Sequence, residues 1–100
     1  MTPLNAMIQA RDVEHQKDAL RLARHISALK QWSDTARDRA QGMVEKWRTE
    51  KLCSPIYINE WDQLLTQSAA HIEGRITACD DMAVVLRRNS PILMTMERPA

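Results

Sequence analysis

The positions of the prolines are the feature that most restricts how this 100-residue chain can fold. Thr2-Pro3 and Ser54-Pro55 both have the pattern of a helix N-cap followed by proline in the first turn, where the missing N–H is not needed because that donor has no intrahelical acceptor. No further proline occurs before residue 52, and the glycine in this span, Gly42, costs only about 1 kcal/mol in a helix interior. The pattern therefore predicts a helix over residues 3–51 and a boundary before Pro55.

The composition favours an all-α fold. Glycine and proline together make up 6 of 100 residues, about half of their usual share, and β-sheet proteins depend on these residues for turns. The chain is too apolar for a disordered segment, while its longest apolar run, Met82 to Leu86, is far shorter than the ~20 residues of a membrane span. We expect a soluble, single helical domain over residues 1–91 and a tail over 92–100 that is either docked or flexible.

The apolar residues between positions 19 and 47 recur in steps of three and four, as in a heptad seam. Ser33 is the polar exception in this series. Upstream, residues 9–18 contain only Ala10 and Val13 as apolar side chains. This leaves two alternatives, an exposed stretch of one long helix or a break near residues 11–18. Because neither glycine nor proline marks a break there, the continuous helix is favoured.

After Ser54 the apolar residues again recur at helical spacing and predict a second helix. Further on, two readings compete. In one, Ser68 and Asp80 each begin a new short helix, and the arginines at 87–88 stand at the negative C-terminal end of the last one. In the other, a single helix continues through Gly74. The charges around residues 80–88 favour at least one kink, so we predict a long N-terminal helix folded as a hairpin against two or three shorter C-terminal helices.

A comparison of lengths points to a second chain. A helix over residues 3–51 would be ~73 Å long, whereas the second half of the chain covers only ~50 Å even as one helix. Either the first helix breaks and folds back, or part of its seam packs against another chain, most simply across a two-fold axis. The homodimer interface predicted on this seam consists of Leu22, Ile26, Leu29, Trp32, Ala36, Ala40 and Met43.

The three tryptophans are predicted to have two different roles. Trp47 lies one turn before the junction at residues 52–55 and Trp61 about two turns after it, so a hairpin there brings both indoles to its closed end. Trp32 stands beside Ser33 and a lysine, and it is either an exposed interface anchor or an edge-packed side chain. The predicted hairpin core consists of Trp47, Tyr57, Trp61, Leu64 and Leu65.

No residue pattern indicates catalysis, a cofactor or a metal. The histidines, His15, His25 and His71, are predicted at the surface and have neither the HExxH pattern nor zinc spacing with cysteine. There is no GxSxG turn and no glycine-rich phosphate loop. Cys53 and Cys79 form no CxxC pair and follow no leader-like segment, which favours a reduced, cytoplasmic location. We expect a non-enzymatic protein with no catalytic, cofactor-binding or metal-binding residues.

The charge pattern keeps nucleic acid binding open as an alternative. The net charge of +1 combines a first half with ten basic and seven acidic residues and a second half with four and six, and this asymmetry is too small for a basic arm. Over residues 37–51 acidic residues interleave with the basic ones, as on a solvated helix face. If the chain binds nucleic acid, the expected contacts are Arg37, Arg39 and Arg48.

These observations together predict a helical protein–protein interaction module. The pattern over residues 54–92 is generally similar to that of small helical bacterial accessory proteins, a likeness that implies no activity. We expect a homodimer that binds a protein partner, without membrane contact, as an adaptor, chaperone, inhibitor or antitoxin-type regulator. A small nucleic-acid-binding transcriptional regulator is the alternative.

Overall fold

The regular structure of this chain consists of α-helices. The computed structural model describes the backbone of residues 3–96 and the side chains of residues 12–96. Every regular element within this range is helical, which confirms the predicted all-α fold. The helices are α1 (Pro3–Lys30), α2 (Asp34–Glu50), α3 (Pro55–Leu64), α4 (Ala69–Ile76), α5 (Asp81–Arg88) and α6 (Pro91–Met96).

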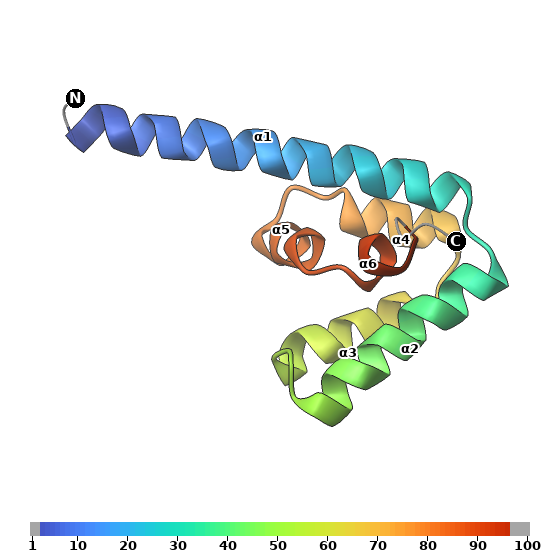
Figure 1. Cartoon of the computed structure of the whole chain (residues 1–100). Coiled ribbons are helices and arrows are strands. Elements are labelled where there is room, and N and C mark those ends of the chain that lie inside the picture. Colours follow the sequence, from blue (N-terminus) through green and yellow to red (C-terminus); the bar gives the residue numbers. More distant parts are fainter. Residues whose placement is uncertain (1–2, 97–100) are drawn as a thin grey trace.

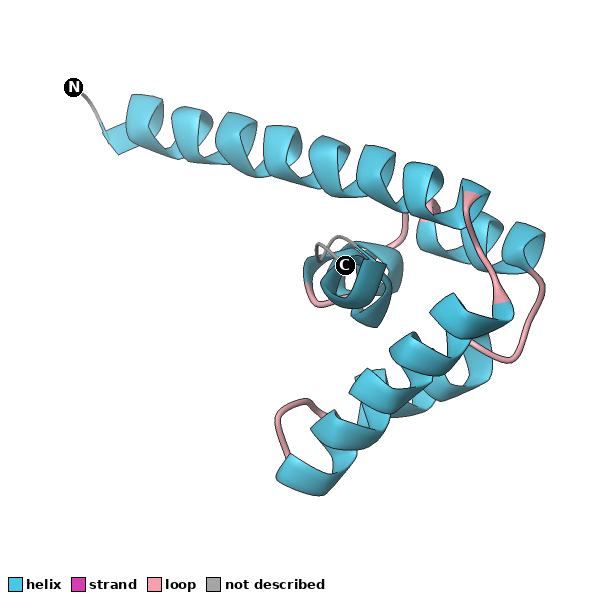
Figure 2. Ribbon diagram, turned by 45° about the vertical axis from the view of Figure 1, so that its right-hand side comes forward, coloured by secondary structure: helices cyan, strands magenta, loops and turns pink. Residues whose placement is uncertain are grey.

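Two arms enclose the C-terminal helices. α1 forms one arm, and α2 forms the other together with α3, which packs against it as a hairpin (Figure 1). α4 and α5 pack against α1, and α6 packs against both α1 and α2, so that α5 and α6 lie between the arms (Figure 2). The N-terminal half of α1 extends beyond all other helices, and the molecule is accordingly elongated, with dimensions of 50 × 30 × 27 Å.

The predicted helix over residues 3–51 is wrong at residues 31–33, where the chain turns back. Gln31 and Trp32 donate backbone hydrogen bonds to carbonyls three residues earlier (3.1 and 3.3 Å), the tighter geometry that often ends a helix. Ser33 is extended (φ −145°, ψ 169°), and its Oγ accepts a hydrogen bond from the Ala36 N–H at 3.1 Å. The serine that interrupts the heptad seam is therefore the N-cap of α2. A break near residues 11–18 is also wrong, because α1 is continuous there.

The α2–α3 hairpin closes at the predicted boundary. Lys51 adopts a left-handed conformation (φ 54°, ψ 42°), and the Leu52 N–H donates to the Trp47 carbonyl at 2.9 Å, which ends α2. Ser54 and Pro55 then begin α3, although the Ser54 side chain makes no capping hydrogen bond. The helix also passes through residue 42, as the weak penalty for glycine predicts.

α4 and α5 are separate helices, as in the first of the two readings. Ser68 Oγ accepts a hydrogen bond from the His71 N–H at 3.2 Å, and Asp80 Oδ1 accepts one from the Ala83 N–H at 2.9 Å. These caps satisfy N–H groups that have no partner within their own helices. The alternative of one helix through Gly74 is therefore wrong, and the kink expected around residue 80 is a complete break.

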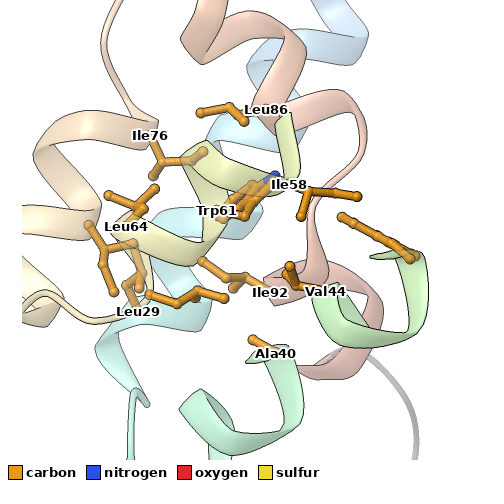
Figure 3. Packing of buried hydrophobic residues seen from close by; sticks show 12 residues of the cluster. Leu29, Ala40, Val44, Ile58, Trp61, Leu64, Ile76, Leu86 and Ile92 are labelled. Carbon is orange, nitrogen blue, oxygen red and sulfur yellow. The ribbon is translucent and has the colours of Figure 1, made fainter. Parts of the chain in front are cut away.

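The core lies where the six helices meet (Figure 3). Four of the residues predicted as hairpin core belong to it: Trp61 and Leu65 are fully buried, and Trp47 and Leu64 are buried. Tyr57 is half-buried and lies outside the core cluster. These side chains do not form a two-helix core by themselves. Residues of α4, α5 and α6 pack onto them, namely Ile72, Ile76, Leu86 and Ile92. The hairpin is therefore one layer of a larger bundle.

The segment predicted as a tail begins as helix α6. Pro91 and Ile92 are buried, and α6 makes its most extensive contacts with α2. Residues 92–96 therefore belong to the folded body. Residues 97–100 lie outside the described range.

The seam predicted as a homodimer interface is largely covered by the chain's own helices. Its buried residues are Leu29, Ala36 and Ala40, and its half-buried ones are Leu22, Ile26, Trp32 and Met43. The physical reason is the break at residues 31–33, which folds α2 back so that α6 packs between the two halves of the seam. The seam therefore packs partly within its own chain, and the homodimer along it stays a prediction.

Candidate functional site

Two cavities lie where α1 passes over α5, and Arg87 and Arg88 line both of them. The first, which we call the groove, has a volume of about 720 Å³ and lies between α1 and α5. The second, which we call the arginine pocket, has a volume of about 240 Å³ and is lined by α1, α5 and α6. Three polar side chains in this region are buried, His25, Arg87 and Ser90. Since buried polar groups need partners, their contacts define the site.

Arg87 is the charged centre of this region. Its side chain is 3% exposed, and it donates two hydrogen bonds to the carboxylate of Asp18, from Nε at 3.0 Å and from Nη2 at 2.7 Å. Its Nη1 donates to the carbonyls of Ile76 and Ala78, both at 2.8 Å. The guanidinium therefore joins α5 to α1 and to the end of α4. A bidentate pair of this kind is among the strongest hydrogen-bonded arrangements in proteins.

The pKa of Asp18 is lowered from its ordinary value, first because its carboxylate accepts hydrogen bonds from Arg87. Partial burial acts in the opposite direction, and the charges of Arg87, Arg21 and Arg88 lower the pKa further. Three guanidinium groups thus act on one carboxylate. The electrostatic potential around Asp18 is therefore positive.

His25 and Ser90 form a buried hydrogen-bonded pair. His25 Nδ1 lies 2.6 Å from the Arg21 carbonyl, which can only accept, so Nδ1 carries the proton. Nε2 then accepts a hydrogen bond from the Ser90 hydroxyl at 2.8 Å, and Ser90 Oγ accepts one from the Ile92 N–H at 3.2 Å. Burial lowers the pKa of His25, and the nearby charge of Arg87 acts in the same direction. The imidazole is therefore held neutral and ties α1 to the start of α6.

A serine beside a histidine is also the arrangement of an activated nucleophile. Here His25 is 0% and Ser90 2% exposed, and the serine oxygen already accepts the Ile92 N–H. We therefore assign the pair a structural role.

The arginine pocket is lined by four arginines from two helices. Arg21 and Arg24 come from α1, and Arg87 and Arg88 come from α5. Ser90 and two apolar residues of α6 complete the lining. Arg21 Nη1 is buried and has no hydrogen-bond partner among the residues that the structure describes. The lining of this pocket is therefore rich in arginine.

The groove has a more apolar lining. Ala19 and Leu22 of α1 face Val84 of α5 across it, and a loose ion pair between Glu14 and Arg88, 3.8 Å apart, stands at its edge. Alongside the groove, all side chains from residue 12 to residue 17 are exposed. Since Glu14 and His15 line the groove, it lies next to the part of α1 that projects from the body (Figure 1).

The residues predicted to contact nucleic acid are mostly engaged within the chain. Arg37 donates to the Leu65 carbonyl, and its guanidinium lies 5.9 Å from the centre of the Trp32 ring. Arg48 is paired with Glu45 and with Asp62 across the hairpin. Arg39 is exposed. The structure therefore uses two of the three arginines to hold the α2–α3 arm, and Trp32 is half-buried against one of them.

The sequence did not predict the burial of the two polar side chains at the centre of this site, His25 and Arg87. The prediction that His25 lies at the surface is wrong. Arg87 was placed at the C-terminal end of a short helix in one of the two interpretations, and its burial was not predicted. A signal for His25 was present, because positions 18, 22, 25 and 29 follow the same spacing of three and four residues as the apolar seam. Arg87 lies four residues after the buried Ala83, but its partner Asp18 is 69 residues away. No local pattern identifies such a partner.

Within residues 3–96, no group of three histidine, cysteine or acidic side chains could hold a metal ion. No helix in this range is long and apolar enough to cross a membrane. Comparison with protein-family models, with curated proteins and with solved structures finds no match to this chain. The functional argument therefore depends on the site itself.

Proposed function

We propose that this chain is a non-enzymatic interaction module that forms a homodimer through the groove and the projecting half of α1. The observation that carries this proposal is the length of α1 that no other helix covers. Its 28 residues span ~42 Å at 1.5 Å per residue. Among the side chains that the structure describes in α1, from residue 12 onward, the first that is at least half-buried is Asp18, and residues 12–17 are all exposed. About half of the helix therefore extends without support from its own chain.

The projecting half of α1 has little stability by itself. Isolated helices shorter than ~12–15 residues are marginal in water, and most helical stability in proteins comes from packing of an apolar face. By sequence, Leu4 precedes Leu22 by 18 residues, or five helical turns, and Met7 and Ile8 are its apolar neighbours. By sequence, these three residues form a separate apolar patch, which a mostly polar stretch over residues 9–18 separates from Leu22. A second copy would cover this patch.

The groove is where we expect that second copy to bind. Its apolar residues Ala19, Leu22 and Val84 lie next to the projecting half of α1, so a two-fold axis there lets each chain cover the other. The exposed charges also fit this arrangement. Asp12 and Glu14 precede Lys17 along α1, so two antiparallel copies bring opposite charges together. The dimer proposed here uses the groove, which shares Leu22 with the predicted seam.

Sedimentation of the full chain at micromolar concentration tests this proposal. We expect a dimer that Ala19→Glu dissociates, because the new carboxylate enters the apolar groove. The matched control is Ala23→Glu, since both alanines are exposed on α1 and only Ala19 lines the groove. A wild-type chain that sediments only as a monomer would refute the homodimer. Equal dissociation by both variants would refute the groove as its interface.

The absence of enzymatic activity is part of the proposal. It is supported by the burial of the His25–Ser90 pair, which keeps its hydroxyl from a substrate. Nucleic acid binding is the weaker alternative, because Arg37 and Arg48 are engaged within the chain. Electrophoretic mobility of mixed-sequence DNA at low salt separates the two functions, since binding through phosphate contacts weakens steeply as salt increases.

A further inference from the structure

We propose that a cavity at the closed end of the α2–α3 hairpin binds a medium-chain aliphatic carboxylate. This cavity, which we call the hairpin pocket, has a volume of about 450 Å³. The turn between the two helices lies at the end of their arm, away from α1 (Figure 1). Ligand pockets in proteins commonly have volumes of ~300–1,000 Å³. The hairpin pocket shares no lining residue with the groove, so binding there does not depend on the proposed homodimer. Its lining consists of Arg48, Lys51, Cys53, Pro55, Ile58 and Asn59.

The walls of the hairpin pocket are suited to an aliphatic chain. Pro55 and Ile58 come from α3, and the half-buried Cys53 comes from the turn before it. The carbon stems of long basic side chains add apolar surface while their charged ends stay in water. Leu52 and Ile56, which neighbour these residues in the sequence, are 60% and 62% exposed, more than any other large apolar side chain that the structure describes. Apolar surface is therefore concentrated at this end of the hairpin.

The charge at the hairpin pocket matches a single carboxylate. Arg48 also lines the pocket, but its Nη1 donates to Glu45 and its Nη2 to Asp62. The Lys51 side chain is exposed and makes no hydrogen bond or ion pair with any residue that the structure describes. One free ammonium group therefore stands beside an apolar cavity. It balances one negative charge and lacks the fork of donors with which arginine matches phosphate, so the lining fits a ligand with an apolar body and one carboxylate.

Isothermal titration calorimetry of the full chain with sodium octanoate tests this proposal. We expect one octanoate to bind per chain, and hexanoate to bind about fifteenfold more weakly, because each buried methylene strengthens binding by about fourfold. 1-Octanol has the same chain length without the charge, and we expect it to bind about threefold more weakly than octanoate, since an exposed ion pair contributes little. Heat that does not saturate, or equal affinity for hexanoate and octanoate, overturns the pocket. Equal affinity for octanoate and 1-octanol overturns the carboxylate assignment.

Two variants and a matched control locate the binding. Lys51→Gln removes the ammonium group and should abolish the preference for octanoate over 1-octanol. Asn59→Phe places a larger side chain at the lining from an exposed position on α3, and we expect it to weaken both ligands about tenfold by excluding part of the chain. Lys46→Gln removes the same charge as Lys51→Gln from an exposed position on α2 outside the pocket and should bind both ligands like the wild type. Equal effects of the two lysine substitutions, or unchanged binding in Asn59→Phe, overturn the proposal.

Discussion

Replacement of Asp18 by alanine is expected to destabilise the fold by about 3 kcal/mol, because it leaves a buried charge without its partner. Arg87 is 3% exposed and loses the acceptors of both Nε and Nη2, while its Nη1 keeps the carbonyls of Ile76 and Ala78. Breaking a buried ion pair costs about 3–5 kcal/mol. The lower end applies here because the Asp18 side chain is 25% exposed and water reaches that side of the pair.

The assay is urea unfolding followed by circular dichroism. With a slope of roughly 2 kcal/mol per molar urea, a loss of about 3 kcal/mol moves the unfolding midpoint down by about 1.5 M. The matched control is Glu14→Ala, one turn earlier on α1. Glu14 and Arg88 are 3.8 Å apart and 49% and 53% exposed, and such surface pairs contribute less than about 1 kcal/mol. If Asp18→Ala shifts the midpoint no more than Glu14→Ala does, the reasoning about the buried pair is refuted.

The same pair predicts a dependence on pH. The pKa of Asp18 is lowered from 3.8, so its contribution to stability is complete above that value and is lost as the pH falls below it. The difference in midpoint between wild type and Asp18→Ala should therefore shrink in acid. A difference that stays constant from neutral pH down to about pH 2 would contradict an ionic contribution from Asp18.

Three further predictions concern the capping, packing and buried histidine of the fold. Ser33→Ala should lower the free energy of unfolding by about 1 kcal/mol in urea titrations. Ser54→Ala should be nearly neutral, because the Ser54 side chain makes no capping hydrogen bond. Equal effects of the two substitutions would show that Ser33 is not a functional cap. Ile92→Ala should cost about 2–5 kcal/mol by calorimetry because the side chain is fully buried, and a cost below about 1 kcal/mol would contradict the docking of α6. Because the pKa of His25 is lowered from 6.5, the unfolded chain takes up the proton first, so stability should fall as the pH decreases below 6.5. This dependence should be weaker in His25→Gln, and an unchanged pH profile would contradict the assignment of a buried, neutral histidine.

The helix boundaries show how far local sequence signals reach. The boundary before Pro55 was predicted, and the starts of α4 and α5 belonged to one of the two interpretations, because N-caps depend on side chains within three residues of the helix start. The boundary at Ser33 carries the same kind of residue, yet it falls on a heptad position without proline or glycine nearby. The apolar residues recur at heptad spacing on both sides of Ser33, so the pattern predicted one continuous helix instead of an N-cap.

The candidate site was much harder to predict from the sequence. Its key contacts join residues that are far apart in the chain: Asp18 and Arg87 differ by 69 in residue number, and His25 and Ser90 by 65. Sequence patterns report which residues share a helix face, but not which helix covers that face. For this reason the predicted surface position of His25 was wrong, and the packing of α6 against the predicted seam was not foreseen.

The chain by itself determined its helical class, the helix starts at Pro3 and Pro55 and the tryptophan-rich end of the α2–α3 hairpin, because propensity, capping and apolar spacing act over a few residues. Only the tertiary structure decided that the long first helix breaks at Ser33 and that α6 fills the space between α1 and α2. It also decided the burial of Arg87 and His25. A charged or polar side chain can be buried only where distant segments supply its partners, and that condition is met by packing rather than by any local pattern. The same packing leaves half of α1 uncovered and brings four arginines around one pocket.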